Sequence, residues 1–316
     1  MDQRIFEYLT ANETPGAPRY LLARLLRGGS SDAFPVSSGH YRPLLAEQRA
    51  DGGYGRFHSM DSQDKTKRVF PTTEQAVRRM RDLDLPKSDP VRTRAARALL
   101  GYAQGTLAYS DRVEKHPDFG ITLASMAAAN LALLGEDCAA LDAAKRACAA
   151  LVEAAAEEIE SGGAAYAERW QRTVYETHVL TLRPETTHVL WLLDDNRFLD
   201  AGAEACFLAH LWNKSVYYTR GIPAGAHLPA DSRYFSDWLS VLELFMGTRG
   251  FARRMEADGT DSFLEGEAMR LAAGAAVPRA GEGPVGRYRE GRRTADGLVW
   301  DTVFRIARIL AAAGRN

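Results

Sequence analysis

The chain has 316 residues, of which 46% are hydrophobic and 26% charged, and its formal net charge is −1. This length and composition are ordinary for a globular protein with a sizeable core, and they argue against disorder on a large scale. A net charge so close to zero provides no long-range field to attract nucleic acid or an anionic membrane surface, so neither is an expected partner.

The sequence predicts a cytoplasmic protein, and its many Ala, Gly and Arg residues indicate a bacterial one. The first residues contain no basic segment leading into an apolar run, so we expect no secretory signal. No segment reaches the ~18 uninterrupted apolar residues that a membrane span requires. Cys138, Cys148 and Cys206 are an odd number in Ala- and Leu-rich stretches, which is typical of buried, reduced thiols.

The N-terminal part, residues 1–45, is predicted to be a helical arm. Two short helices over residues 2–11 and 17–27 are separated by a cluster of helix breakers between Thr14 and Pro18. A further short apolar helix at residues 44–47 then runs into a glycine-rich turn.

From this turn onward the pattern predicts repeated helical hairpins. Each unit has an opening helix, a tight polar turn, and a second helix rich in Ala and Leu. The first predicted hairpin pairs a helix over residues 72–83 with one over 91–102. The second pairs a helix over residues 121–134 with one that ends near residue 156. They are followed by 185–193 with a stretch to 212, by 234–246 with a stretch to 256, and by a single final helix at 300–313. Because one hairpin cannot bury its apolar face alone, neighbouring hairpins must stack, which predicts one all-α domain over residues 1–316.

Two connections interrupt the pattern. The first is residues 161–184, and the second, over residues 257–298, is rich in Gly and Pro. Long irregular loops in compact domains are often lids or rims of binding sites, and they are also often disordered. Both alternatives remain open for residues 257–298.

The glycine-rich turn carries a resemblance to a known family. Gln48-x-x-x-Gly52-Gly53-Tyr54-Gly55 resembles the Gln-and-Trp turn motif of squalene cyclases, with Tyr54 in the place of Trp. Pro71-Thr72-Thr73 is similar to the start of the helix that follows such a turn. Over residues 42–102 the chain resembles the α/α-toroid proteins of the terpenoid cyclase and protein prenyltransferase class. This resemblance implies a single α/α toroid, a ring of helical hairpins around a central cavity.

The departures from this family concern its chemistry. The Asp-x-Asp-Asp motif of the cyclases is absent, and neither the zinc set of the prenyltransferases nor that of the lanthionine cyclases has a counterpart. The fold is therefore carried over and the catalytic residues of these families are not.

In an α/α toroid the N-terminal ends of the opening helices meet at the mouth of the cavity, so residues there are candidate site residues. Asp237, Asp301 and His188 are the predicted acid or base residues, and Trp238 and Trp300 are predicted apolar walls. Helix capping is the alternative role for each Ser, Thr or Asp. The remaining predicted ligand contacts are Tyr54, Thr73, Asp118, Glu185 and Trp191.

A second candidate cluster follows the glycine turn. Arg56, His58 and Asp61 lie on one loop, where a histidine between an arginine and an aspartate can transfer protons near neutral pH. Ordinary solvated loop residues are the alternative. No His-x-x-x-His pair or other strict ligand motif occurs, so no metal and no cofactor is predicted. Asp194-Asp195 is interpreted as a hairpin turn rather than a magnesium motif.

The sequence therefore predicts a small-molecule enzyme or binder that uses a central cavity for a small apolar or polar organic ligand. A terpenoid-like or prenyl-like ligand is implied by the resemblance alone. The alternatives are a non-catalytic scaffold, which expects an exposed apolar patch, and a carbohydrate-processing enzyme, which needs two carboxylates facing each other. The oligomeric state is open.

Overall fold

The computed structural model describes residues 2–27, 33–59, 66–112, 119–161, 184–217, 219–277, 288–289 and 294–314. These residues are built from α-helices and one short 3-10 helix, and they contain no β-strand beyond isolated bridges. The prediction of an all-α protein is confirmed. The chain divides into two compact units, with Arg42–Phe207 in one and Met1–Tyr41 together with Leu208–Asn316 in the other. We call the first the hairpin unit and the second the terminal unit.

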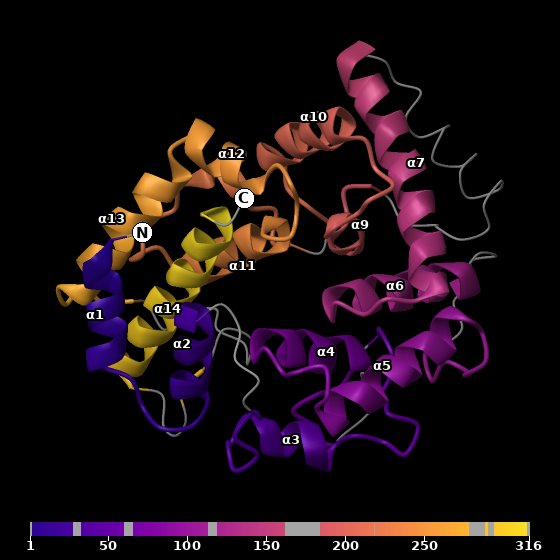
Figure 1. Cartoon of the computed structure of the whole chain (residues 1–316), viewed down its shortest axis with the longest axis horizontal. Coiled ribbons are helices and arrows are strands. Elements are labelled where there is room, and N and C mark those ends of the chain that lie inside the picture. Colours follow the sequence, from indigo (N-terminus) through magenta and orange to yellow (C-terminus); the bar gives the residue numbers. More distant parts are fainter. Residues whose placement is uncertain are drawn as a thin grey trace. The chain divides into compact units, whose positions relative to one another are not determined.

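The hairpin unit contains the glycine turn and the first predicted hairpins (Figure 1). Its helices are α3 (Tyr41–Ala46), α4 (Thr73–Asp82), α5 (Pro90–Ala103), α6 (Phe119–Leu133), α7 (Ala139–Ser161) and α9 (Thr187–Leu193), followed by the start of α10 (Ala201–Trp212). Helix α6 is central, since it packs against α4, α5, α7 and α9. Every residue from Ser125 to Ala132 is buried, as expected for a helix that is apolar on all sides.

Local capping explains where these helices begin. The side chain of Thr72 accepts a hydrogen bond from the backbone N–H of Gln75 at the start of α4. Asp89 does the same for two N–H groups of α5, and Pro90 occupies the first helical position, where its missing N–H costs nothing. The helix expected over residues 91–102 is therefore observed as α5.

The terminal unit joins the two ends of the chain. It contains α1 (Gln3–Ala11), α2 (Ala17–Arg27), η1 (Ala224–Ala226), α11 (Phe235–Phe245), α12 (Phe251–Ala257), α13 (Thr260–Ala272) and α14 (Ala295–Ala313). Helix α14 packs against α1, α2, α11, α12 and α13. Inside this packing the guanidinium of Arg305 donates hydrogen bonds to both carboxylate oxygens of Glu243, at 2.8 and 2.9 Å. The buried ion pair ties α14 to α11.

One expectation about this unit was wrong. Residues 257–298 were expected to be irregular, but Thr260–Ala272 form helix α13. The buried positions Leu264, Ala268 and Leu271 follow the helical spacing of three to four residues. Most of the glycines and both prolines of residues 257–298 lie after this helix, and most of that later stretch is outside the described residues.

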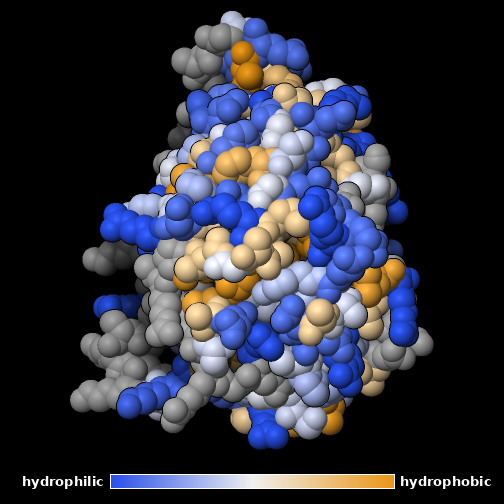
Figure 2. All heavy atoms as spheres, turned by 90° about the vertical axis from the view of Figure 1, so that its left-hand side faces the viewer, coloured by the Kyte–Doolittle hydropathy of each residue, from blue (hydrophilic) through white to orange (hydrophobic). Residues whose placement is uncertain are grey.

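The surface formed by the described residues carries apolar side chains only in small groups, between hydrophilic ones, on the face drawn in Figure 2. Scattered apolar side chains of this kind are normal on a protein surface. Across the ranges that the structure describes, none of the helices combines the length and the apolarity needed to cross a membrane.

Candidate functional site

The glycine turn packs directly onto helix α5. Gln48 donates from Nε2 to the carbonyl oxygens of Gly52 and Val91, at 3.1 and 2.8 Å. The guanidinium of Arg94 donates to the side-chain oxygen of Gln48 at 2.7 Å. Gln48 therefore satisfies polar backbone groups where the turn meets the helix, and its role here is structural.

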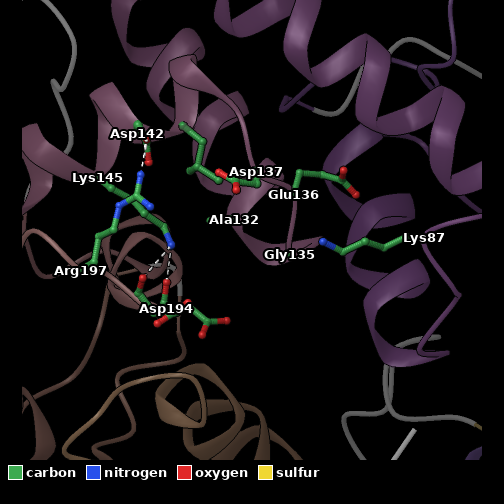
Figure 3. A pocket seen from close by; sticks show the side chains of 11 residues that line it. Lys87, Ala132, Gly135, Glu136, Asp137, Asp142, Lys145, Asp194 and Arg197 are labelled. Atoms are coloured by element: carbon green, nitrogen blue, oxygen red, sulfur yellow. Dashed lines mark hydrogen bonds and ion pairs between the residues drawn. The ribbon is translucent and has the colours of Figure 1, made fainter. Parts of the chain in front are cut away.

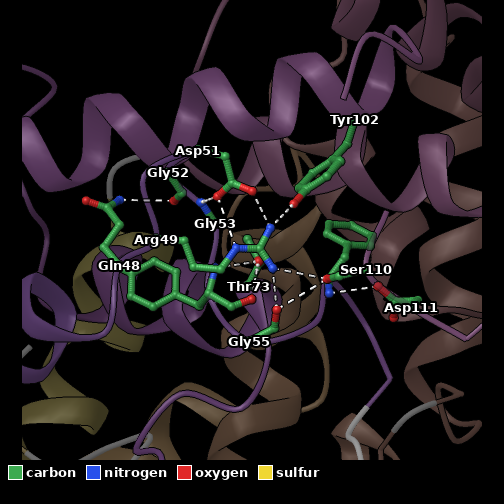
Figure 4. A network of polar contacts seen from close by, with 12 residues as sticks. Gln48, Arg49, Asp51, Gly52, Gly53, Gly55, Thr73, Tyr102, Ser110 and Asp111 are labelled. Carbon is green, nitrogen blue, oxygen red and sulfur yellow. Dashed lines mark hydrogen bonds and ion pairs between the residues drawn. The ribbon is translucent and has the colours of Figure 1, made fainter. Parts of the chain in front are cut away.

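Arg49 closes the same turn from the other side (Figure 4). Its guanidinium pairs with the carboxylate of Asp51 and donates to the carbonyl oxygen of Gly55 at 2.6 Å. It also contacts the hydroxyls of Tyr102 and Ser110 at 3.2 Å. Since one side chain links several segments, the turn has a single defined conformation from which the following loop departs.

Asp111 fixes the loop that carries His58. Its carboxylate accepts hydrogen bonds from the backbone N–H groups of Phe57, His58 and Ser59, at 2.8, 2.9 and 2.7 Å. The hydroxyl of Ser59 donates to the same carboxylate at 3.0 Å. The backbone of His58 is thus held by an aspartate more than fifty residues further along the chain.

Two opening helices of the hairpin unit begin in the same way. Thr72 caps α4, and Thr186 caps α9. In each case a second, buried threonine follows, and the next residue is Glu74 in α4 and His188 in α9. Glu74 and His188 therefore occupy equivalent positions, in the first turn of equivalent helices.

These two side chains meet His58 in a cluster. Nε2 of His188 donates to Oε1 of Glu74 at 2.7 Å, and Nδ1 of His58 donates to Oε2 at 2.5 Å. Asn130 of α6 donates from Nδ2 to Oε1 at 2.9 Å. The side chains of Glu74 and His188 are only 7% and 1% exposed, whereas that of His58 is 27% exposed. The cluster is thus buried on one side and accessible at His58.

The cluster is charged. Burial opposes ionisation of Glu74, but His188 and His58 outweigh it and hold the pKa of this carboxyl well below its usual range. The hydrogen bond to Glu74 raises the pKa of His58, while burial lowers the pKa of His188. The carboxylate is therefore ionised, the accessible imidazole favours the protonated form, and the buried imidazole favours the neutral form.

An arginine and a tryptophan lie one turn further along the same two helices. The guanidinium of Arg78 lies over the ring of Trp191, 4.8 Å from its centroid. The Trp191 ring also packs edge-on against His188, with 5.0 Å between the ring centroids. Arg78 has no ion pair with an acidic residue in the described ranges, and its Nε is buried without a hydrogen-bond partner. Among the residues that the structure describes, Arg78 is thus a positive group next to the cluster that has no acidic partner.

The other predicted residues of this unit have backbone partners. The hydroxyl of the buried Tyr54 donates a hydrogen bond to the carbonyl oxygen of Leu44 at 2.7 Å. The hydroxyl of Thr73 accepts from the backbone N–H of Tyr54 and donates to its carbonyl oxygen. The backbone of Arg56 pairs with those of Pro71 and Thr73. Glu185 directly precedes the cap of α9. Asp61 and Asp118 lie outside the described residues.

The predicted residues of the terminal unit have roles in its own packing. Trp238 and Trp300 are fully buried, and their indole N–H groups donate to the carbonyls of Ala224 and Leu9. Asp301 accepts from the backbone N–H groups of Tyr288 and Arg289, at 3.1 and 3.0 Å. Asp237 lies 3.5 Å from the guanidinium of Arg220. The prediction that these residues contact a ligand together with His188 remains a prediction.

A cavity of about 290 Å³ lies at the other ends of the opening helices (Figure 3). It is lined by the hairpin turns, including Gly135 and the pair Asp194 and Asp195. The carbonyl oxygens of these two aspartates accept from Nζ of Lys145, at 2.6 and 3.2 Å. Both aspartates lie in the turn between α9 and α10, as the sequence predicts. The lining charges are of both signs, and Asp142 pairs with Arg197 inside the cavity.

Replacing Asp111 by alanine tests whether this aspartate positions His58. The substitution leaves three backbone N–H groups without their acceptor, and we expect a loss of about 2 kcal/mol in the free energy of unfolding. Urea denaturation of Asp111→Ala against the unchanged protein measures it. Asp142→Ala is the matched control, because its pair with a 63%-exposed arginine contributes under about 1 kcal/mol. Equal stability of the two variants would contradict the assigned role.

Sequence reasoning identified His58 and His188 but missed Glu74, Asp111, Asn130 and Arg78. A signal for Glu74 was present, because aligning Thr72-Thr73 with Thr186-Thr187 places Glu74 opposite His188. No local signal marks the other residues, since their importance comes from contacts between distant segments.

Comparisons with protein-family models, with curated proteins and with solved structures found no match for this chain. The functional assignment therefore depends on the geometry of the site.

Proposed function

We propose that the chain is a small-molecule enzyme with the α/α-toroid arrangement, and that His58, Glu74 and His188 form its reaction centre. The observation that carries the proposal is the buried carboxylate of Glu74, which accepts a hydrogen bond from each of two imidazoles. Burying a charge is costly, and helix α4 is already capped by Thr72 without it. Strongly perturbed ionisable groups of this kind concentrate at functional sites.

The toroid part of the proposal is supported by the hairpin unit. In a ring of helical hairpins, the opening helices direct equivalent ends toward one mouth. Helices α4 and α9 begin with equivalent capped turns, and the side chains just inside those turns are in direct contact at 2.7 Å. The resemblance of the glycine turn to that of squalene cyclases agrees with this arrangement.

The proposed substrate is a small organic molecule with an anionic group. Arg78 supplies the positive charge, and its planar guanidinium suits a carboxylate or phosphate. Trp191 supplies an apolar face beside it. His58, the accessible member of the cluster, is the group that can exchange a proton with the bound molecule.

The two rival functions receive less support. A scaffold expects a large exposed apolar patch, but hydrophobic and hydrophilic residues are interspersed on the face in Figure 2. A glycosidase requires two carboxylates about 5 to 9 Å apart. Among the described side chains of the cluster, Glu74 is the carboxylate that both imidazoles contact. The nearby carboxylate of Asp111 already accepts hydrogen bonds from backbone N–H groups, which gives it a structural role and not that of a second catalytic carboxylate.

A ligand screen by thermal shift tests the proposal. We expect carboxylates or phosphate esters to raise the melting temperature of the unchanged protein, and neutral analogues to leave it unchanged. Arg78→Gln should abolish the shift. Arg146→Gln is the matched control, because Arg146 also lies over an aromatic ring, that of Phe198 at 3.9 Å, outside the cluster.

Turnover provides the second measurement. For any compound that binds through Arg78 and reacts, His58→Gln is expected to reduce kcat by at least about 100-fold, the usual contribution of proton transfer by a positioned side chain. Retention of full turnover in His58→Gln, or ligand shifts that are unaffected by Arg78→Gln, would refute the proposed site.

A further inference from the structure

We infer that His58, Glu74 and His188 bind one divalent transition-metal ion, with Zn²⁺ as the representative of its class. The inference rests on the proposed function, because it concerns the same reaction centre. Two imidazole nitrogens and one carboxylate oxygen are a common ligand set for zinc and related ions. In this cluster one ligand atom from each residue lies within 4.8 Å of the others.

Binding an ion requires the three side chains to rearrange around it. Zinc binds imidazole nitrogen and carboxylate oxygen at about 2.0 to 2.2 Å, so the ligand atoms around one ion lie roughly 3.3 Å apart. The nitrogens of His58 and His188 already converge on the two oxygens of Glu74, at 2.5 and 2.7 Å. Both rings direct toward Glu74 the atoms that would bind the ion, and the three ligand atoms lie within 4.8 Å of one another, so the longest of these separations has to shorten by up to about 1.5 Å around an ion.

The ligands are held by further contacts, as metal ligands usually are. Asn130 fixes one oxygen of Glu74, and Asp111 fixes the backbone of His58. The capped first turns of α4 and α9 hold Glu74 and His188 on rigid helices. A site prepared in this way loses little conformational entropy when it binds an ion.

A second observation points to a ligand at the same place. The side-chain oxygen of Asn130 is buried and has no hydrogen-bond partner, although the amide nitrogen of the same group contacts Glu74. Leaving a buried acceptor unsatisfied costs about 1 to 3 kcal/mol. A water molecule bound to an ion at the cluster would supply the missing donor.

The accessible side of the cluster suits a catalytic ion. Three protein ligands leave at least one coordination position for water or substrate, the arrangement typical of catalytic rather than structural zinc sites. His58 is on the exposed side, and the positive Arg78 favours an anionic group at that position. The inferred ion is compatible with the proposed anionic substrate, but with the ion bound His58 is a ligand, and proton exchange passes from His58 to the water on the ion.

Direct metal binding tests the inference without reference to activity. The full chain is stripped with a chelator, and titration calorimetry with ZnCl₂ and CoCl₂ is expected to show one equivalent bound. His58→Ala should weaken binding by more than about 100-fold, since even loss of an outer contact of a metal site costs 10- to 100-fold. His58 lies on a partly exposed loop, so this variant should remain folded, as circular dichroism will verify.

His210→Ala is the matched control, because it removes an imidazole from α10 outside the cluster and should bind one ion as the unchanged protein does. Binding that is absent, or equal in His58→Ala and His210→Ala, would overturn the inference. Such a result would leave the proposed function intact if His58→Gln still abolishes turnover. Conversely, one tightly bound ion with turnover unaffected by His58→Gln would support the metal site and refute the proposed function.

Discussion

Replacing Gly55 by alanine is expected to destabilise the hairpin unit by about 4 kcal/mol or more, which is at the upper end for single substitutions. A β-carbon at this position would lie 2.0 Å from the carbonyl oxygen of Pro71, and the residue has a φ of +26°. Gly52→Ala should behave in the same way, because its β-carbon would lie 2.2 Å from the carbonyl oxygen of Arg94 at a φ of +91°. In both cases the clash is with backbone, which cannot move aside like a side chain.

Gly105→Ala separates the clash from the backbone strain. Gly105 also has a positive φ, +69°, but an added β-carbon would have no atom within 4 Å. Only the left-handed conformation then opposes alanine, at a cost of about 1 to 2 kcal/mol. Urea denaturation followed by circular dichroism measures all three variants. If Gly55→Ala were no less stable than Gly105→Ala, this result would contradict the close approach of the turn to the backbone of Pro71.

Removing the carboxylate of Glu74 is the second change for which we expect a large effect. Glu74→Ala leaves the buried imidazole of His188 without its acceptor, removes one of the two acceptors of Asn130 Nδ2, and opens a gap beside His58. Breaking a buried charged contact by removing one partner typically costs about 3 to 5 kcal/mol, and we expect a loss of about 3 kcal/mol in the free energy of unfolding. Thermal and urea denaturation of the variant provide the measurement.

Two variants make this result specific. Glu74→Gln keeps the shape and one acceptor oxygen, so its loss in the free energy of unfolding should be at most half of that in Glu74→Ala. Glu13→Ala is the control for the loss of a glutamate, because Glu13 pairs with a 63%-exposed arginine, which contributes under about 1 kcal/mol. A loss in Glu74→Ala no larger than that in Glu13→Ala would mean that the carboxylate is not the shared acceptor of the cluster.

Much of the helical architecture follows from local patterns. The hairpin pattern predicted helices near their observed positions, since apolar spacing is a local property of the sequence. Helix α13 was missed because the glycines after Ala272 indicated an irregular segment, and this segment was taken to begin at residue 257. The division into two compact units depends on which helices pack together, which no local pattern encodes.

The candidate site was predictable only in part. His58 and His188 were identified because they lie beside a glycine turn and at the start of an opening helix. Their shared partner Glu74 is 16 residues from one and 114 residues from the other. Ligand motifs recognise short spacings, so a site assembled from one loop and two distant helices has no such motif. This separation is also why the sequence contains no ligand motif at these residues.

The central claim is that one carboxylate and two imidazoles converge at the starts of α4 and α9. A high-resolution crystal structure of the unchanged chain, grown with Zn²⁺ and measured with anomalous scattering at the zinc edge, tests it most directly. The account predicts that the side chains of His58, Glu74 and His188 meet, with one anomalous peak between them. Side chains of Glu74 and His188 that point to separate surroundings, with no peak between them, would contradict the account.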